Sequence, residues 1–259
     1  MGFSGDNGWT GLQYSLWRML LGTVLASIAS WLLMSFAGTT IDVVMLALLL
    51  LVCLPLVLGW WDRAAAIVLA GLVVVNFITH VVDEQTGWAL AAVLCLHAMT
   101  PAAPLGSLAA RGRTDPRGGW FLSPLAYRAA WGIVLVATVL AAFDLPATDP
   151  IGILELVIRA IFVTAVVLAV PARSRPVAWF LLAVVWALLG FSGLSPLVVL
   201  TVLPAWLLCA DPAWVAPAGA GSAWLFYDGH CGLCHRCVRI ALSEDRDGTA
   251  FRFGPLGGA

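Results

Sequence analysis

Residues 40–60 read TIDVVMLALLLLVCLPLVLGW, and Asp42 is the only charged side chain among them. A helix of about 20 apolar residues is long enough to cross the hydrocarbon core of a bilayer. Most of the chain has the same character, because 62% of its 259 residues are hydrophobic and 10% are charged, with a mean hydropathy of +0.99. A soluble protein of this size does not need so apolar a composition. The sequence therefore predicts an all-α, polytopic membrane bundle.

Charges, prolines and glycines divide residues 11–210 into eight apolar stretches, each predicted as a transmembrane helix. The stretches are 11–36, 40–60, 63–82, 87–106, 121–143, 150–171, 176–191 and 194–210. The last two are short, and the residues from Gly190 to Pro196 favour a turn between them. A single kinked helix or a re-entrant pair is the alternative for this region. Residues 1–8 lack the basic leader of a signal peptide, so the first stretch is expected to be retained.

The loop arginines predict the orientation of these helices. Arginines are present in the second, fourth and sixth predicted loops and absent from the first, third and fifth; they are Arg63, Arg111, Arg113, Arg117, Arg173 and Arg175. Arginine-rich loops stay in the cytoplasm, so both termini are expected there. We therefore expect a multi-pass protein of the bacterial inner membrane, with the lipid bilayer as its partner. The net charge of -1 leaves no basic patch for binding nucleic acid.

The composition changes at residues 211–222, which are rich in Pro, Ala and Gly and are predicted to be a linker. This linker separates a transmembrane domain, residues 1–210, from a C-terminal segment, residues 223–259. In that segment the pattern predicts a strand over 223–227, a helix over 233–244 and a second strand over 250–253. The turn after the first strand contains the C-x-x-C pair Cys231 and Cys234.

The position of Cys231 favours thiol chemistry. A cysteine in the first turn of a helix lies near free backbone N–H groups and the positive end of the helix dipole, which favour thiolate over thiol. Cys234 follows at the spacing that closes a disulfide over one helical turn, so it is predicted to be the resolving thiol. Asp228 is expected to shape the turn. His230 and His235 either stabilise the thiolate when protonated or are simply solvated.

The C-terminal segment closely resembles the opening of the DCC-type thiol-disulfide oxidoreductases, through YDGHCGLCHR at residues 227–236 and FRFGPL at 251–256. The family is named for the pattern D-x-x-C-x-x-C, which here is Asp228, Cys231 and Cys234. The resemblance implies a thioredoxin-like fold, a dithiol–disulfide function and an unidentified thiol or disulfide protein as partner. Domains of this family continue for several dozen residues beyond the second strand. A segment of about 37 residues is therefore expected to be completed by another chain, by further sequence, or by docking on the membrane domain.

The same cysteines allow other interpretations. Cys231 to His235 also fits C-x-x-C-H, the attachment pattern of c-type haem. Cys231, Cys234 and Cys237 are spaced as ligands of zinc or an iron–sulfur cluster, although the sequence offers no obvious fourth ligand. Cys237 otherwise fits helix packing. A further alternative belongs to another class: a non-catalytic accessory or scaffold subunit of a larger membrane complex, in which the C-terminal segment is only a docking piece.

The membrane part has a looser resemblance of its own. Residues 56–66, 97–101 and 106–108, together with Asn76, resemble the HTTM membrane domain shared by bacterial homologues of the vitamin K-dependent carboxylase. That resemblance extends loosely over residues 11–210. Carboxylase activity is not expected, because the catalytic lysine of that enzyme has no counterpart in a chain that contains no lysine.

A charged pair is predicted inside the sixth span. Burying an ion in lipid is costly unless it is paired or hydrated. Glu155 and Arg159 lie four residues apart on one helix face, so they are predicted to satisfy one another. A substrate or quinone contact at this pair is the alternative. No other cofactor and no metal is predicted.

Uncharged polar side chains indicate a second intramembrane site. Asn76, His80 and His97 are predicted to line a polar cavity between the third and fourth spans, because polar groups in a bundle face its interior. Single intramembrane histidines also serve as helix-bridging groups, which is the structural alternative. Arg18 lies near the inner end of the first span and is predicted to extend its charge to water by snorkelling.

Overall fold

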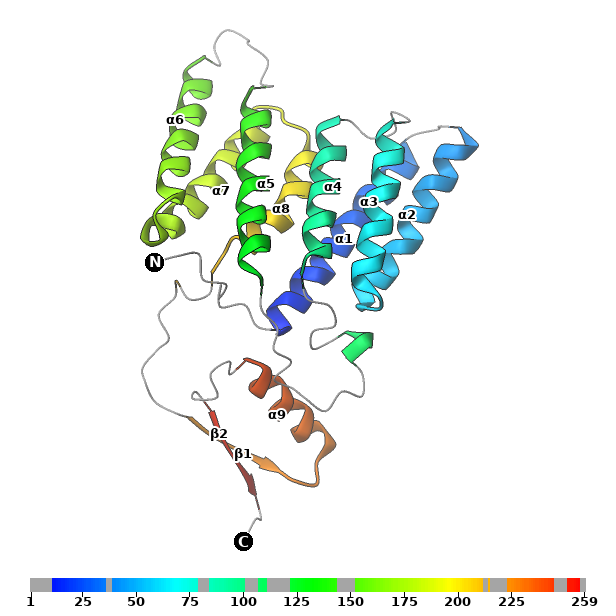
Figure 1. The fold of residues 1–259 in the computed structure, drawn as a ribbon, viewed down its shortest axis with the longest axis vertical. Coiled ribbons are helices and arrows are strands. Elements are labelled where there is room, and N and C mark those ends of the chain that lie inside the picture. The colour runs from blue at the N-terminus through cyan, green and yellow to red at the C-terminus, as the bar shows by residue number, and fades with distance from the viewer. Residues whose placement is uncertain are drawn as a thin grey trace.

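The computed structural model describes residues 11–35, 39–78, 84–100, 107–110, 122–143, 152–211, 214, 223–244 and 251–256. These residues are mostly helical, with a small two-stranded sheet near the C-terminus (Figure 1). The helices of the larger part are α1 (Gly11–Ser35), α2 (Thr40–Leu58), α3 (Asp62–Ile78), α4 (Glu84–Ala98), α5 (Pro124–Phe143), α6 (Gly152–Ala169), α7 (Arg175–Phe191) and α8 (Pro196–Leu208). Short 3₁₀ turns lie at η1 (Leu108–Ala110) and η2 (Ala172–Ser174).

Each of the eight predicted apolar stretches overlaps one of these helices, although α3, α4 and α7 begin one to three residues earlier than predicted. A turn separates α7 from α8, and Gly193 within it has a φ of 94°, so the alternative of one kinked helix is wrong. Four helical segments are long and apolar enough to cross a membrane: Gln13–Ser35, Thr40–Leu58, Pro124–Ala142 and Ala172–Phe191. Pro196–Leu208 is apolar but shorter. The apolar helices are compatible with a membrane protein, and crossings by the remaining helices stay a prediction.

The ends of the helices follow from local sequence. Thr39 and Asp42 form a capping box at the start of α2, in which each side chain bonds the other's backbone N–H group. Gly59 ends α2 in the left-handed conformation, with a φ of 66°. Ser195 caps α8 by accepting the backbone N–H of Leu197 at 3.3 Å. Capping side chains and one left-handed glycine thus set these helix boundaries.

The short helix α8 lies at the centre of the bundle. It packs against α1, α4, α5 and α7. Trp17 of α1 donates its indole N–H to the Pro204 carbonyl at 2.7 Å, and the hydroxyl of Tyr127 in α5 donates to the Cys209 carbonyl at 3.2 Å. These bonds tie α1 and α5 to the C-terminal end of α8.

The outer surface of the bundle is apolar. Met34 and Phe191 are 89% and 88% exposed, and further large exposed apolar side chains lie on α2, α3, α5 and α6. Apolar surface on this scale is unusual for a protein surrounded by water. It is the surface that a lipid environment would cover.

The C-terminal segment forms a β-α-β unit. β1 (Ala223–Asp228) and β2 (Phe251–Leu256) are parallel and in register from Ala223 opposite Phe251 to Asp228 opposite Leu256. α9 (Gly232–Glu244) connects them. Parallel strands require such a crossover. Both strands are longer than the sequence predicts, since pairing extends β1 to Asp228 and β2 to Leu256. The unit lies beyond one end of the bundle, and α9 contacts α1 (Figure 1).

Candidate functional site

The two cysteines of the C-x-x-C pair lie at the start of α9, as the sequence predicts. The backbone N–H of Cys231 donates to the Asp228 carbonyl at 3.2 Å, which closes the turn between β1 and the helix. The Cys231 carbonyl accepts the N–H of His235 at 3.1 Å and so opens the helical ladder. Cys231 and Cys234 are both partly exposed, and both are free thiols. The pair is therefore placed where a partner can reach it.

A hydrogen bond distinguishes the two thiols. The backbone N–H of Cys234 donates to Sγ of Cys231 at 3.4 Å. This bond, together with the thiol of Cys234 and the N–H of Leu233, holds the pKa of Cys231 below its ordinary value. The side-chain hydrogen bond to Cys231 raises the pKa of Cys234. The geometry thus favours a thiolate at Cys231 and a thiol at Cys234, the division of roles that thiol exchange needs.

The polar side chains of the turn bond its backbone and make no hydrogen bond to the sulfur atoms among the described contacts. Oδ1 of Asp228 accepts the backbone N–H of His230 at 2.9 Å, an Asx-type bond within the turn. Nε2 of His235 lies 2.8 Å from the Gly229 carbonyl oxygen, and its ring meets Tyr227 edge to face at 5.7 Å. The predicted role of Asp228 in shaping the turn has this direct counterpart. His235 is engaged with the backbone of the turn and shows no bond to a thiol.

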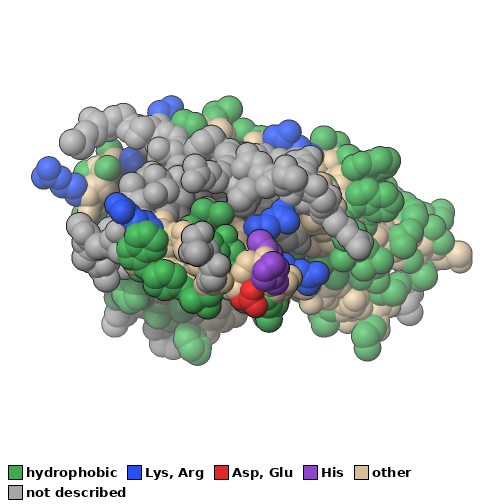
Figure 2. All heavy atoms as spheres, turned by 90° about the horizontal axis from the view of Figure 1, so that it is seen from below, with side chains coloured by type: hydrophobic (Ala, Val, Ile, Leu, Met, Phe, Trp, Pro, Cys, Tyr) green, Lys and Arg blue, Asp and Glu red, His purple; other side chains and the backbone are tan. Residues whose placement is uncertain are grey.

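The surface around the turn is exposed and polar. Seen from the end that carries the β-α-β unit, histidine and acidic side chains lie together with arginines close by (Figure 2). His230, His235 and Asp228 are exposed, as is Arg236 in the first half of α9. Charged groups that meet solvent here interact weakly with one another. Their solvent-facing atoms are accessible to a partner, although Asp228 and His235 also bond the backbone of the turn.

The geometry gives little support to the haem, metal-ligand and helix-packing interpretations of the cysteines. Cys237 is exposed, so the prediction that it packs inside the unit is wrong. Among the described residues no group of three or more His, Cys, Asp or Glu side chains could hold a metal ion. His235, which would be the axial ligand of a C-x-x-C-H haem site, is bound to the Gly229 carbonyl oxygen.

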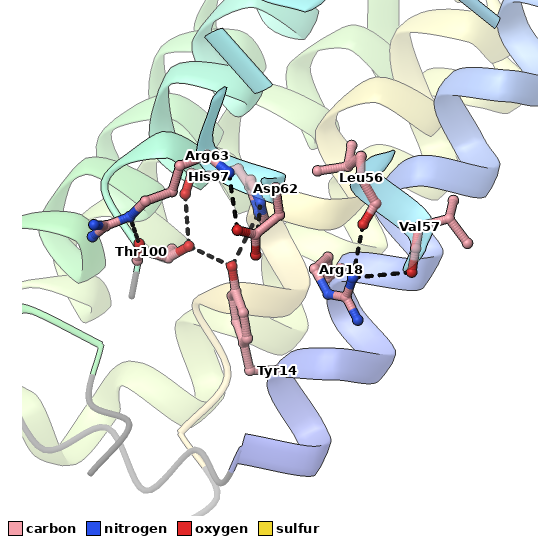
Figure 3. Close-up of polar contacts among 8 residues, drawn as sticks. All are labelled: Tyr14, Arg18, Leu56, Val57, Asp62, Arg63, His97 and Thr100. Carbon is pink, nitrogen blue, oxygen red and sulfur yellow. Dashed lines mark hydrogen bonds and ion pairs between the residues drawn. The ribbon is translucent and has the colours of Figure 1, made fainter. Parts of the chain in front are cut away.

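A second polar site lies inside the bundle, at the end nearest the β-α-β unit (Figures 1 and 3). The side chain of Tyr14 reaches from α1 to the end of α4. Its Oη is 3.3 Å from Nδ1 of His97 and 2.5 Å from Oγ1 of Thr100. Thr100 donates to the His97 carbonyl at 2.6 Å. Asp62, at the start of α3, brings Oδ2 to 3.9 Å from Nε2 of His97. All four side chains are buried.

Two arginines flank this cluster. Arg63 donates through Nε to the Thr100 carbonyl at 2.7 Å. Arg18 is fully buried and donates through Nη1 to the carbonyls of Leu56 and Val57 at 2.9 and 3.0 Å. The prediction that Arg18 snorkels to water is therefore wrong. Its guanidinium instead stabilises the last turn of α2, where carbonyls and the negative end of the helix dipole attract a cation.

The polar residues predicted to line one intramembrane cavity do not form a single site in the structure. His97 belongs to the cluster just described, whereas Asn76 lies 14 residues beyond Asp62 on α3, roughly 21 Å along the axis, and donates to the Leu72 carbonyl in its own helix. The structure does not bring Asn76 and His97 together. His80 lies outside the described residues. Glu155 and Arg159 form the predicted ion pair across one turn of α6.

An apolar cavity of about 450 Å³ opens between α4, α5 and α8. Its lining includes Ala92, Gly132 and Val136, together with the polar side chain of Gln85. Neither Glu155 nor Arg159 lines it. The alternative of a substrate or quinone contact at that ion pair therefore does not involve this cavity.

Sequence reasoning missed Tyr14, Asp62 and Thr100 as site residues. Asp62 and Arg63 follow one residue after the apolar stretch that ends at Trp60, and a charged pair at such a position is typical of an ordinary loop. Trp61, between them and that stretch, has a φ of 51°, which is uncommon for any residue with a Cβ. Comparison with known proteins adds nothing to this picture, since no family model, no curated protein and no solved structure matches the chain.

Proposed function

We propose that the protein is a membrane-anchored thiol-disulfide oxidoreductase with its C-x-x-C pair on the cytoplasmic side. The observation that carries this proposal is the bond from the Cys234 N–H to Sγ of Cys231 at the first turn of α9. Such a bond favours the attacking thiolate at Cys231 while leaving Cys234 protonated. The resemblance of the turn to DCC-type proteins supports the same assignment.

The exchange takes two steps. The Cys231 thiolate attacks one sulfur of a partner disulfide, which forms a mixed disulfide and releases the other partner sulfur as a thiolate. The mixed disulfide no longer accepts the Cys234 proton, so the cause that raises the pKa of Cys234 disappears. Cys234 then loses its proton and attacks Sγ of Cys231, which expels the second partner thiolate. The partner gains two electrons and two protons, and Cys231 and Cys234 become a disulfide; the reverse sequence oxidises a dithiol.

The proposed anchor is the bundle of α1 to α8, with each helix crossing the bacterial inner membrane and both termini in the cytoplasm. The six loop arginines support this orientation through the positive-inside rule. A reporter that fluoresces only in the cytoplasm, fused after residue 222, is expected to give signal. Darkness at normal expression would move the cysteines to the opposite side and contradict the proposal.

The redox proposal is tested by alkylation of the full chain with iodoacetamide over a range of pH. Cys231 should react first and keep its reactivity to lower pH than Cys237, which is exposed on the same helix and serves as the matched control. Cys234→Ser should accumulate a mixed disulfide at Cys231, because the resolving thiol is gone. Cys237→Ser should trap nothing. Equal rates at Cys231 and Cys237 with no trapped species would leave the redox proposal without support.

One observation favours a non-catalytic scaffold as the second candidate. Trp224 and Phe226 stack at 5.9 Å on the face of the sheet away from α9 and are 58% and 61% exposed. Arg252 lies over the Trp224 ring at 5.9 Å on the same face. Exposed aromatic and arginine side chains are frequent in protein interfaces. If Cys231→Ser and Cys234→Ser leave growth and complex formation intact while Trp224→Ser releases a partner subunit, the scaffold function is favoured.

A further inference from the structure

The contact between Asp62 and His97 is unusual for a buried pair. The two side chains are 2% and 0% exposed, and Oδ2 of Asp62 lies 3.9 Å from Nε2 of His97. Neither atom has a hydrogen-bond partner among the described residues. Buried polar atoms are nearly always hydrogen-bonded, so two of them facing each other require an explanation. A finished structural ion pair would close to about 2.7–3.2 Å.

Counting hydrogens supplies the explanation. Four contacts form one chain: Asp62 Oδ2 to His97 Nε2, His97 Nδ1 to Tyr14 Oη, Tyr14 Oη to Thr100 Oγ1, and Thr100 Oγ1 to the His97 carbonyl. Each contact needs one hydrogen. With Asp62 ionised and His97 neutral, the ring and the two hydroxyls supply three. The contact left without a hydrogen is the long one at Asp62.

One additional proton completes the chain. Thr100 donates to the His97 carbonyl, so Tyr14 must donate to Thr100, and Nδ1 of His97 must donate to Tyr14. Nε2 of His97 then carries no hydrogen, and its lone pair faces Oδ2 of Asp62. A proton placed between them, on either atom, gives every contact one donor and one acceptor. The two hydroxyl groups can rotate, which lets the chain adjust when that proton leaves.

The groups around the pair hold it in place. The Arg63 backbone N–H donates to Oδ1 of Asp62 at 2.9 Å and fixes the carboxylate at the start of α3. The other titratable or charged side chains at the pair are Tyr14 and Arg18 of α1 and Arg63 of α3; α8, which packs on α1 and α4, has no charged side chain. Trp61, directly before Asp62, has a φ of 51°, a strained conformation of the kind that clusters at functional sites.

We propose that Asp62 and His97 form a proton-binding site within the bundle, which gains and loses one proton between the carboxylate and the imidazole. Buried acid and histidine chains of this kind are the usual proton carriers of membrane domains. The site is distinct from the C-x-x-C turn, and its function does not depend on the cysteines. It makes the bundle more than an anchor, because a proton taken up there changes the charge between α1, α3 and α4.

Histidine NMR of the full chain tests the proposal. The sequence has four histidines, so replacing His80, His230 and His235 by Gln leaves ¹⁵N-labelled His97 as the only signal. A proton on the ring moves both ring nitrogens to imidazolium shifts as the pH falls. A proton on Asp62 instead gives an infrared carboxylic-acid band that is absent in Asp62→Asn. Either result supports the proposal: Asp62→Asn should remove the carboxylic-acid band in the second case and move the imidazolium transition of His97 to lower pH in the first.

Two further variants keep the test decisive if Asp62→Asn folds poorly. Tyr14→Phe removes the acceptor of the Nδ1 hydrogen and should displace the midpoint of the His97 or Asp62 transition. Thr138→Val, which removes a buried hydroxyl that bonds Val134 in α5 outside the cluster, should leave the midpoint unchanged. A His97 spectrum constant over the whole pH range in which the protein stays folded, with no carboxylic-acid band that depends on Asp62, would overturn the proposal.

Discussion

Replacing Gly59 by Ala tests how closely the polar cluster is packed against the end of α2. Gly59 has a φ of 66°, and a Cβ at this position would overlap the Arg18 guanidinium and the Cβ of Ser107. Placing a residue with a Cβ in the left-handed region costs roughly 1–2 kcal/mol. Displacing Arg18 also weakens its bonds to the Leu56 and Val57 carbonyls, and a bond to a charged group contributes about 1.5–3 kcal/mol. The expected loss of unfolding free energy is therefore about 2.5–5 kcal/mol.

The measurement is equilibrium unfolding of the purified protein in detergent micelles. Gly71→Ala is the matched control, because Gly71 lies within α3 and a Cβ there meets nothing within 4 Å. It should be neutral or stabilising by up to about 1 kcal/mol. Arg18→Ala in the Gly59→Ala background should recover part of the combined loss, because the guanidinium that blocks the Cβ is gone. The reasoning is refuted if Gly59→Ala unfolds like Gly71→Ala, or if the two substitutions at Gly59 and Arg18 are strictly additive.

Two further predictions concern pairs elsewhere in the bundle. Glu155→Leu or Arg159→Leu alone should lower the folded yield, because an unpaired ion at bilayer depth costs up to about 3 kcal/mol, and the double Leu variant should recover it; equal yields of the single and double variants would place the pair in water. Trp179 and Trp206 stack at 4.1 Å, and each donates its indole N–H to the other's carbonyl, at 2.9 and 3.0 Å. Trp179→Phe should cost about 0.5–1.5 kcal/mol of unfolding free energy in the same micelles, because it removes the indole bond to the Trp206 carbonyl while that carbonyl keeps the Cys209 N–H; an unchanged midpoint would show that the bond contributes nothing.

The helices could be predicted from the sequence because their signal is local. An apolar stretch, a capping pair such as Thr39 and Asp42, and a terminating Gly59 are all visible within about 20 residues of one another. The cysteine turn is local too, since the bonds of Asp228 and His235 span two and six residues. Strand ends were less predictable, because pairing with a distant partner decides where β1 and β2 stop.

The buried cluster could not be predicted, because its parts meet only through packing. Tyr14 and His97 are 83 residues apart in the sequence, and nothing in either segment indicates the other. The sequence predicts that Arg18 extends its charge to water, because it lies near the end of its span. The fold instead places its guanidinium against the carbonyls at the end of α2. Asn76 was grouped with His97 because neighbouring spans carry them, yet the position of each along its helix puts them at different depths.

The β-α-β unit depends on its surroundings for stability but not for the geometry of its thiols. Among its described residues Val238 alone is buried, and Trp224 and Phe226 remain exposed, so the unit has no core of its own. The bonds that favour a thiolate at Cys231 all lie within the turn and the first helical turn, and they need no core. In the proposed exchange the reactivity of Cys231 would therefore depend on local geometry, whereas recognition of a partner would depend on the exposed face of the sheet. A partner that covers Trp224 and Phe226 would supply the apolar contacts that the unit does not make within itself.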